Sequence, residues 1–223
     1  MDIERSRKGK VMKIIKTDGV FNFTEIEGGN GWYWCCDYAS GDLYEAEELF
    51  QHNHPIKNNR LVFIHYPDGR VVEPIKAREG QYFGAPAYDH GKLQILMVDF
   101  SVSVIRIFQY EDAVEQTTLR AEISLAEVQD CYNVMFAHAP LMLIRQGFEN
   151  LFQVVWPEKT EFHIGNQESF YSRDGDKLYF SRWFEDPEYR DEVVIRHYPS
   201  GEILEVIPGS LWEMPDGQRW VLQ

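Results

Sequence analysis

Two segments of the chain share one pattern of residues. Residues 62–69 read VFIHYPDG and residues 194–201 read VIRHYPSG, so in both an apolar run leads into a turn that contains proline and glycine. Two further apolar runs between them end in an aromatic residue, at Tyr110 and Trp156. The aromatic positions 66, 110, 156 and 198 are therefore 44, 46 and 42 residues apart. A regular period of this length indicates consecutive copies of one supersecondary unit.

Each repeat divides into four short runs of apolar residues, which predict four β-strands. The second repeat shows this most clearly, because an Asp-His-Gly turn separates its first two runs. Glycine after a small polar residue between apolar runs favours a tight hairpin. We expect strands at 32–37, 43–48, 61–66 and 71–75 in the first repeat, at 82–88, 93–99, 104–110 and 117–123 in the second, at 132–138, 141–145, 151–156 and 161–164 in the third, and at 170–172, 178–183, 193–198 and 203–207 in the fourth.

The two ends of the chain supply the remaining strands. Runs at 211–214 and 220–222 near the C-terminus, and at 11–16 and 20–25 near the N-terminus, would together form one more four-stranded unit. In repeat length and strand count these units resemble the blades of β-propellers, over essentially the whole chain and without the motif of any specific propeller family. The resemblance implies an all-β fold: a five-bladed β-propeller of four-stranded blades, closed by N- and C-terminal strands, as a single domain over residues 1–223.

Two segments also fit helices. Asp42 and Glu45 are three residues apart at the start of residues 42–50, which suits a capped helix N-terminus. Ser124 and Glu127 form a capping box and predict a helical turn near residues 125–130. The alternative to a propeller is a two-layer β-sandwich or an open barrel with a similar number of strands.

Charge and composition limit the partners. The formal net charge is −14, and a field of this sign repels a phosphate backbone, so nucleic acid is not an expected partner. No apolar run approaches the ~20 residues that cross a bilayer, and the first residues lack a secretory apolar run, so no membrane association is expected. The three cysteines include the adjacent pair Cys35 and Cys36, which does not suggest a disulfide framework. We therefore expect a cytoplasmic protein.

The propeller resemblance implies where a site would lie. In propellers the first strand of each blade lines a central channel, and ligands sit on the face formed by the loops that lead into those strands. Asn30, Asp130 and Glu168 each lie two residues before a predicted first strand. A ring of oxygen ligands suits a hard cation, so these three are the candidate metal ligands and calcium is the candidate cofactor. The alternative is that these residues only shape turns.

The same positions suggest two further roles. Two carboxylates across a channel suit the acid and base of glycoside hydrolysis, so Asp130 and Glu168 are the candidate catalytic residues, with Asp37 and Glu213 as further carboxylates. Aromatic residues that begin the predicted first strands could stack on a ring of the ligand or pack between blades. The candidate ligand-binding set is Asn30, Trp32, Tyr82, Asp130, Tyr132 and Glu168.

The function expected from these features is that of a binding or interaction module, which presents a loop-rich face to a protein or to a small-molecule or carbohydrate ligand. No phosphate-binding loop, dinucleotide fingerprint, nucleophile elbow or zinc-protease motif is present in the sequence. The alternatives are a glycoside-acting hydrolase with carboxylates at the channel mouth, or a metal-dependent, lactonase-like hydrolase. The sequence leaves both an enzyme and a non-catalytic protein open.

Overall fold

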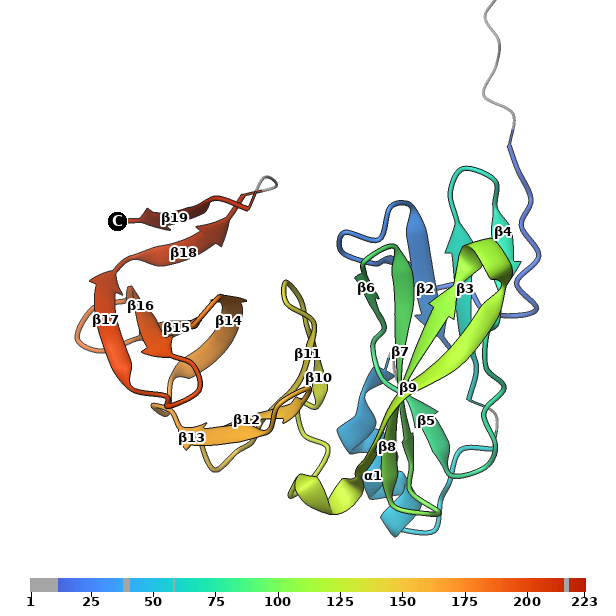
Figure 1. Ribbon diagram of the computed structural model, residues 1–223, viewed down its shortest axis with the longest axis horizontal. Coiled ribbons are helices and arrows are strands. Elements are labelled where there is room, and N and C mark those ends of the chain that lie inside the picture. The colour runs from blue at the N-terminus through green and yellow to red at the C-terminus, as the bar shows by residue number, and fades with distance from the viewer. Residues whose placement is uncertain (1–11, 38–40, 58, 215–216) are drawn as a thin grey trace, which may run out of the picture.

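The chain folds into a series of antiparallel sheets. A computed structural model describes all residues except 1–11, 38–40, 58 and 215–216. In the described part there are three four-stranded sheets, one five-stranded sheet and one two-stranded sheet. The sheets follow one another along an arc (Figure 1). Val11, Ser40 and Asp216, which the sequence places in an expected strand or turn, lie outside the described residues.

The first two sheets occupy one end of the arc. The first sheet has the order β1 (Thr24–Glu25), β2 (Trp32–Cys36), β3 (Leu61–His65) and β4 (Arg70–Val72). In the second sheet β5 (Gln81–Phe83) and β6 (Ala87–Asp89) both pair with β7 (Lys92–Asp99), which is followed by β8 (Val104–Glu111) and β9 (Gln116–Ser124). Short 3₁₀ helices, η2 (Asp112–Val114) and η3 (Leu125–Glu127), flank β9.

The other three sheets continue the arc. The third sheet has the order β10 (Met135–Ala137), β11 (Met142–Gln146), β12 (Leu151–Trp156) and β13 (Thr160–His163). The fourth has the order β14 (Glu168–Asp174), β15 (Lys177–Phe184), β16 (Arg190–His197) and β17 (Ile203–Pro208). The fifth is the hairpin of β18 (Ser210–Glu213) and β19 (Arg219–Leu222). The all-β class and the four-stranded units expected for the second, third and fourth repeats are thus confirmed. The second unit has a fifth strand, because the strand expected at 82–88 is divided into β5 and β6.

The strand expected at residues 43–48 is wrong, because this segment is the helix α1 (Leu43–Gln51). The side chain of Asp42 accepts hydrogen bonds from the backbone N–H groups of Tyr44 and Glu45, at 3.0 and 3.2 Å, and so caps the first turn. Leu43 and Ala46, three residues apart, are buried on one side of the helix. The helical interpretation of residues 42–50 is therefore correct, and the helical turn expected after Ser124 is present as η3.

Alternating side chains hold the sheets together face to face. Along β7, Leu93, Ile95 and Met97 pack in one cluster with the first sheet, while Leu96 and Val98 pack in another with the third sheet. Successive residues of a strand point to opposite faces, so a strand that is apolar throughout can serve two neighbours. The same alternation recurs in the fourth sheet, where Val194 packs toward the third sheet and Val193 and Ile195 toward the fifth.

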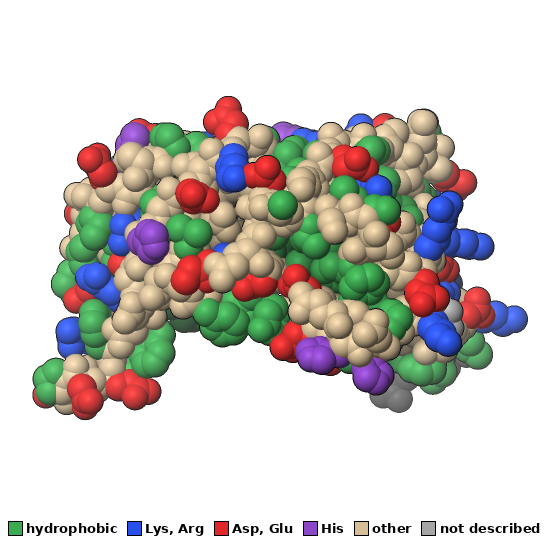
Figure 2. All heavy atoms as spheres, turned by 90° about the horizontal axis from the view of Figure 1, so that it is seen from below, with side chains coloured by type: hydrophobic (Ala, Val, Ile, Leu, Met, Phe, Trp, Pro, Cys, Tyr) green, Lys and Arg blue, Asp and Glu red, His purple; other side chains and the backbone are tan. Residues whose placement is uncertain are grey.

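The closing sheet expected from both termini is not formed by the described residues. Thr24 and Glu25 pair with Trp34 and Tyr33 of β2, so the N-terminal strand belongs to the first sheet and not to the fifth. Val20 is buried in a cluster with Cys35 and Val62, and this contact holds the N-terminal segment on the first sheet. In Figure 2, which views the molecule from below, the lower outline is hollowed between the two ends.

The packing between the third and fourth sheets gives a test of stability. Phe152 is fully buried and contacts the rings of Phe162, Phe170 and Phe180. Replacing it in Phe152→Ala should lower the free energy of unfolding by about 3–5 kcal/mol, measured by urea denaturation, because the lost ring leaves a cavity. The matched control is Phe21→Ala, at a phenylalanine that is 80% exposed, where the change should stay within about 0.5 kcal/mol. Equal losses in both variants would contradict the packing described.

Candidate functional site

A cleft of about 980 Å³ lies where the first strands of the last three sheets approach one another. Its lining comes from β10 and the turn after it, from residues 169–172 of β14, from the β18–β19 hairpin, and from Glu27 and Gly28 beside β1. This volume lies at the upper end of the roughly 300–1,000 Å³ that ligand pockets span. The cleft is the candidate binding site.

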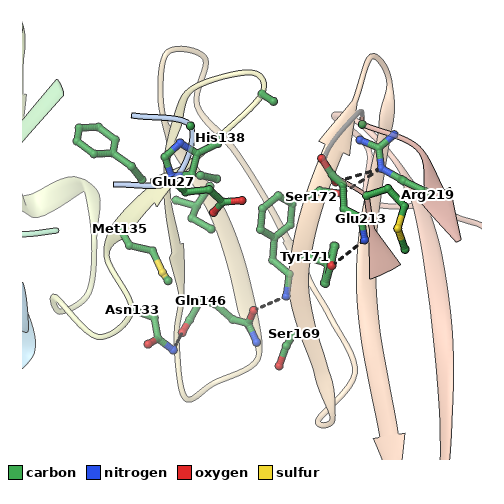
Figure 3. A pocket seen from close by; sticks show the side chains of 18 residues that line it. Glu27, Asn133, Met135, His138, Gln146, Ser169, Tyr171, Ser172, Glu213 and Arg219 are labelled. Atoms are coloured by element: carbon green, nitrogen blue, oxygen red, sulfur yellow. Dashed lines mark hydrogen bonds and ion pairs between the residues drawn. The ribbon is translucent and has the colours of Figure 1, made fainter. Parts of the chain in front are cut away.

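Figure 3 shows side chains on two opposite walls of the cleft. One wall carries Glu27, Asn133, Met135 and His138; the other carries Tyr171, Ser172, Glu213 and Arg219. Met135 and Tyr171 line the cleft and are 41% and 42% exposed. The cleft therefore offers uncovered apolar area to a ligand.

Gln146 ties the third sheet to the fourth at one side of the cleft. Its amide nitrogen donates to the backbone oxygen of Glu168 at 2.7 Å, and its amide oxygen accepts from the backbone N–H of Phe170 at 3.0 Å (Figure 3). Asn133 donates to the backbone oxygen of Gln146 at 3.3 Å. A side chain with both a donor and an acceptor is needed to satisfy the backbone in this way.

Arg219 anchors the β18–β19 hairpin to the fourth sheet. Its guanidinium donates to Asp174 at 3.0 Å, lies 3.5 Å from the carboxylate of Glu213, and sits over the ring of Tyr179. The hydroxyl of Tyr171 accepts from the backbone N–H of Glu213 at 3.1 Å. The positive charge of Arg219 is thus matched by two carboxylates. On the opposite wall Glu27 is exposed, and within the described residues it has no ion-pair partner.

Three of the residues expected at a site lie in the first two sheets and do not line the cleft. Asn30 is exposed in a turn, with a φ of 49°. Trp32 is 4% exposed and packs against Phe63 and His65. Tyr82 is 1% exposed, and its hydroxyl accepts from the backbone N–H of Ile56 at 2.9 Å. These contacts are those of a turn residue and of two core aromatic residues, and a ligand-binding role for them stays a prediction.

Asp130 and Tyr132 lie just before β10. A carboxylate oxygen of Asp130 accepts from the fully buried Arg145 at 2.8 Å. Arg145 also donates to Glu149 at 2.6 Å, and this hydrogen bond lowers the pKa of the Glu149 carboxyl below its usual value. The ring of Tyr132 stacks on that of the exposed Phe148, with 3.6 Å between centroids.

Glu168 begins β14 and is 3% exposed. Its two carboxylate oxygens accept from Arg196 at 2.9 and 3.1 Å, and Arg182 lies 3.5 Å away. A guanidinium beside a carboxylate both occupies its oxygens and repels a metal cation. The arginine contacts of Asp130 and Glu168 therefore do not favour calcium binding. A calcium site formed by these two residues and Asn30 stays a prediction.

Sequence reasoning missed the arginine partners and most of the cleft. Arg145 and Arg196 stand inside apolar runs, and a charged residue in such a run is a signal for a buried ion pair. His138 ends an expected first strand and Glu213 was a candidate carboxylate, and both line the cleft. Glu27 and Arg219 carry no comparable signal, because their position depends on how distant sheets meet.

Cys131 follows Asp130 and is buried. Burial raises the pKa of its thiol, and the nearby carboxylate of Glu47 raises it further. The thiol is protonated at neutral pH, which does not suit a nucleophile.

Comparisons of the chain with protein-family models, with curated proteins and with solved structures found no match. Among the described residues, no helix has the length and apolar character needed to cross a membrane. The described residues also contain no group of three or more His, Cys, Asp or Glu side chains placed to hold a metal ion.

The ion pair of Glu168 gives a second test of stability. Glu168→Gln removes the negative charge and leaves Arg196, which is 7% exposed, as an uncompensated buried cation. Breaking a buried pair in this way should lower the free energy of unfolding by about 3–5 kcal/mol, measured by urea denaturation. Glu27→Gln is the matched control at an exposed carboxylate and should change it by less than about 0.5 kcal/mol. A Glu168→Gln variant as stable as the wild type would rule out a structural role for this carboxylate.

Proposed function

We propose that the protein is a propeller-type binding module and that its ligand occupies the cleft. The observation that carries the proposal is the cleft itself, which is lined by the first strands of three sheets and leaves Met135 and Tyr171 partly uncovered. Ligand sites are concave and mostly apolar with a few polar groups that orient the ligand. The cleft has this composition, with Glu27, His138 and Glu213 as polar groups beside the apolar walls.

Hydrolysis of a glycoside is a second candidate, which one observation favours. Glu27 and Glu213 line opposite walls of the cleft (Figure 3), and general acid and base catalysis on a sugar needs two carboxylates. This pair differs from Asp130 and Glu168, whose carboxylates accept hydrogen bonds from Arg145 and Arg196. Binding is the first candidate because it requires only the shape and composition of the cleft.

A variant that blocks the cleft with a bulky side chain tests the binding function. Ser169 lines the cleft and is exposed, so Ser169→Trp should block it without disturbing the core. A thermal-shift screen of sugars, amines, nucleotides and peptides should give a ligand that raises the Tm of the wild type, since a ligand at 100 times its Kd contributes about 2.7 kcal/mol. Ser169→Trp should abolish the shift. Thr118→Trp, at an exposed residue of β9, is the control and should keep it.

Two outcomes of this screen discriminate between the candidates. A ligand whose shift survives in Ser169→Trp binds elsewhere and contradicts the proposal. Turnover of a chromogenic glycoside that is lost in both Glu27→Gln and Glu213→Gln would favour hydrolysis over binding alone.

The propeller interpretation adds that the sheets form a closed ring of five blades. Exposed side chains on the outer face of the fifth sheet support a closed ring. Trp212 and Trp220 are cross-strand neighbours that are 54% and 50% exposed, while Leu211 on the other face packs on the fourth sheet. An exposed pair of tryptophans on an otherwise packed element marks a contact surface. Across the gap in the arc from this hairpin, Figure 1 shows β6 and β2.

Quenching of tryptophan fluorescence tests the closed ring. In a closed ring Trp212 and Trp220 are shielded, so the double variant Trp212→Phe/Trp220→Phe should leave the fraction of emission that acrylamide quenches unchanged or higher. Trp183→Phe is the control, because Trp183 is 43% exposed on β15 and its removal should lower that fraction. A marked decrease in the double variant would show that the arc stays open.

A further inference from the structure

We propose that the cleft binds an extended segment of a protein partner that carries lysine or arginine side chains. The inference rests on the proposed binding function and adds the chemical class of the ligand. It is built on three features of the cleft: its charge, its apolar walls, and the free strand edges along it.

The charge of the cleft is negative. Glu27 and Glu213 contribute carboxylates from opposite walls, and Arg219 is the lining residue with a guanidinium. Arg219 is paired with Asp174 as well as with Glu213. Glu27 has no such partner in the described part of the chain. The net charge of −14 adds a long-range field that attracts cations and repels anions. An anionic ligand is therefore disfavoured and a cationic one is favoured.

The apolar walls suit a cation that has a hydrophobic stem. Lysine and arginine bury their methylene groups against apolar surface while the charged head reaches a polar group. Met135 and Tyr171, partly exposed on opposite walls, offer that surface near the two carboxylates. The ring of Tyr171 can also receive a cation on its face. This protein already uses that contact elsewhere, with Arg173 over Tyr198 and Arg219 over Tyr179.

Free strand edges along the cleft favour a peptide over a small amine. β10 pairs with β11 and β14 with β15, and within the described residues neither has a strand on its other side. The lining includes residues 169–172 of β14 and residues 135–137 of β10, so both strands border the cleft. Gln146 already bonds to the backbone oxygen of Glu168 and the backbone N–H of Phe170 at the start of β14, so the backbone partners of a peptide would be those of β10 and of the rest of the β14 edge. An extended peptide can use such an edge for backbone hydrogen bonds.

Three labelled peptides of equal length test the inference by fluorescence anisotropy. They are (Lys-Thr)₄, (Gln-Thr)₄ and (Glu-Thr)₄, which differ in charge but keep alternating residues. We expect (Lys-Thr)₄ to bind at least about tenfold more tightly than (Gln-Thr)₄, and (Glu-Thr)₄ not to bind. The affinity for (Lys-Thr)₄ should fall as the salt concentration rises, because exposed charges are screened.

Charge variants show whether the cleft is the site. The double variant Glu27→Gln/Glu213→Gln should weaken binding of (Lys-Thr)₄ about tenfold or more. Glu158→Gln/Glu188→Gln is the matched control, because it removes two exposed carboxylates that do not line the cleft and changes the net charge equally. Equal weakening in both double variants would mean that only the overall charge matters, and would overturn the inference.

The remaining outcomes separate this inference from the proposed function. If (Gln-Thr)₄ binds as tightly as (Lys-Thr)₄ and both are lost in Ser169→Trp, the cleft binds peptides but does not select cations. If spermidine displaces (Lys-Thr)₄ at an equal concentration of positive charge, the ligand is a small polyamine and the peptide assignment is wrong. If none of the peptides binds while another ligand from the thermal-shift screen is lost in Ser169→Trp, the inference fails and the proposed function stands.

Discussion

The structure depends on the alternation of side chains along strands that are apolar on both faces. A strand such as β7 presents Leu93 and Ile95 to one neighbouring sheet and Leu96 and Val98 to the other. Each interior sheet is therefore covered on both sides, and the chain can add one sheet after another without closing a barrel. At the ends of the series this arrangement leaves one face of the first sheet and one face of the fifth without a further sheet. The N-terminal segment packs on the former through Val20, while Trp212 and Trp220 remain exposed on the latter.

Charged residues form buried ion pairs within the sheets and exposed carboxylates in the cleft. Asp130 lies just before β10 and Glu168 begins β14, and they pair with Arg145 and Arg196 in largely buried contacts. A buried pair contributes little net stability, but loss of one partner is costly, so these pairs constrain how the loops meet the strands. In the cleft the carboxylates of Glu27 and Glu213 are exposed to solvent, where a ligand can reach them. Glu27 has no guanidinium partner among the described residues, and Glu213 shares Arg219 with Asp174, so both are better placed for recognition than the buried Glu168.

The cleft combines features that separately are common. Its walls include first strands that pair on one side only, its surface includes uncovered apolar side chains, and its carboxylates outnumber its one guanidinium among the described lining residues. The first strands of the third and fourth sheets, β10 and β14, border this place, and among the described residues each pairs with a strand on one side only. The position of the cleft between the third, fourth and fifth sheets also couples it to the β18–β19 hairpin, which Arg219 holds against the fourth sheet. A ligand in the cleft would contact both the hairpin and the sheets beside it.

The sequence by itself determined the local part of this structure. The repeat of 44, 46 and 42 residues, together with glycine and proline turns, predicted the all-β class and the strands of three repeats, because hydrophobic alternation and turn chemistry are local properties. Residues 43–48 were ambiguous, since the same apolar residues fit a strand or a helix capped by Asp42, and the cap and the packing of Leu43 decided for the helix. Only the tertiary structure decided the partners of Asp130 and Glu168, the pairing of β1 with β2, and the meeting of Glu27, Met135, Tyr171 and Glu213 in one cleft. These depend on which faces of distant sheets come together, and no periodicity within a single segment records that.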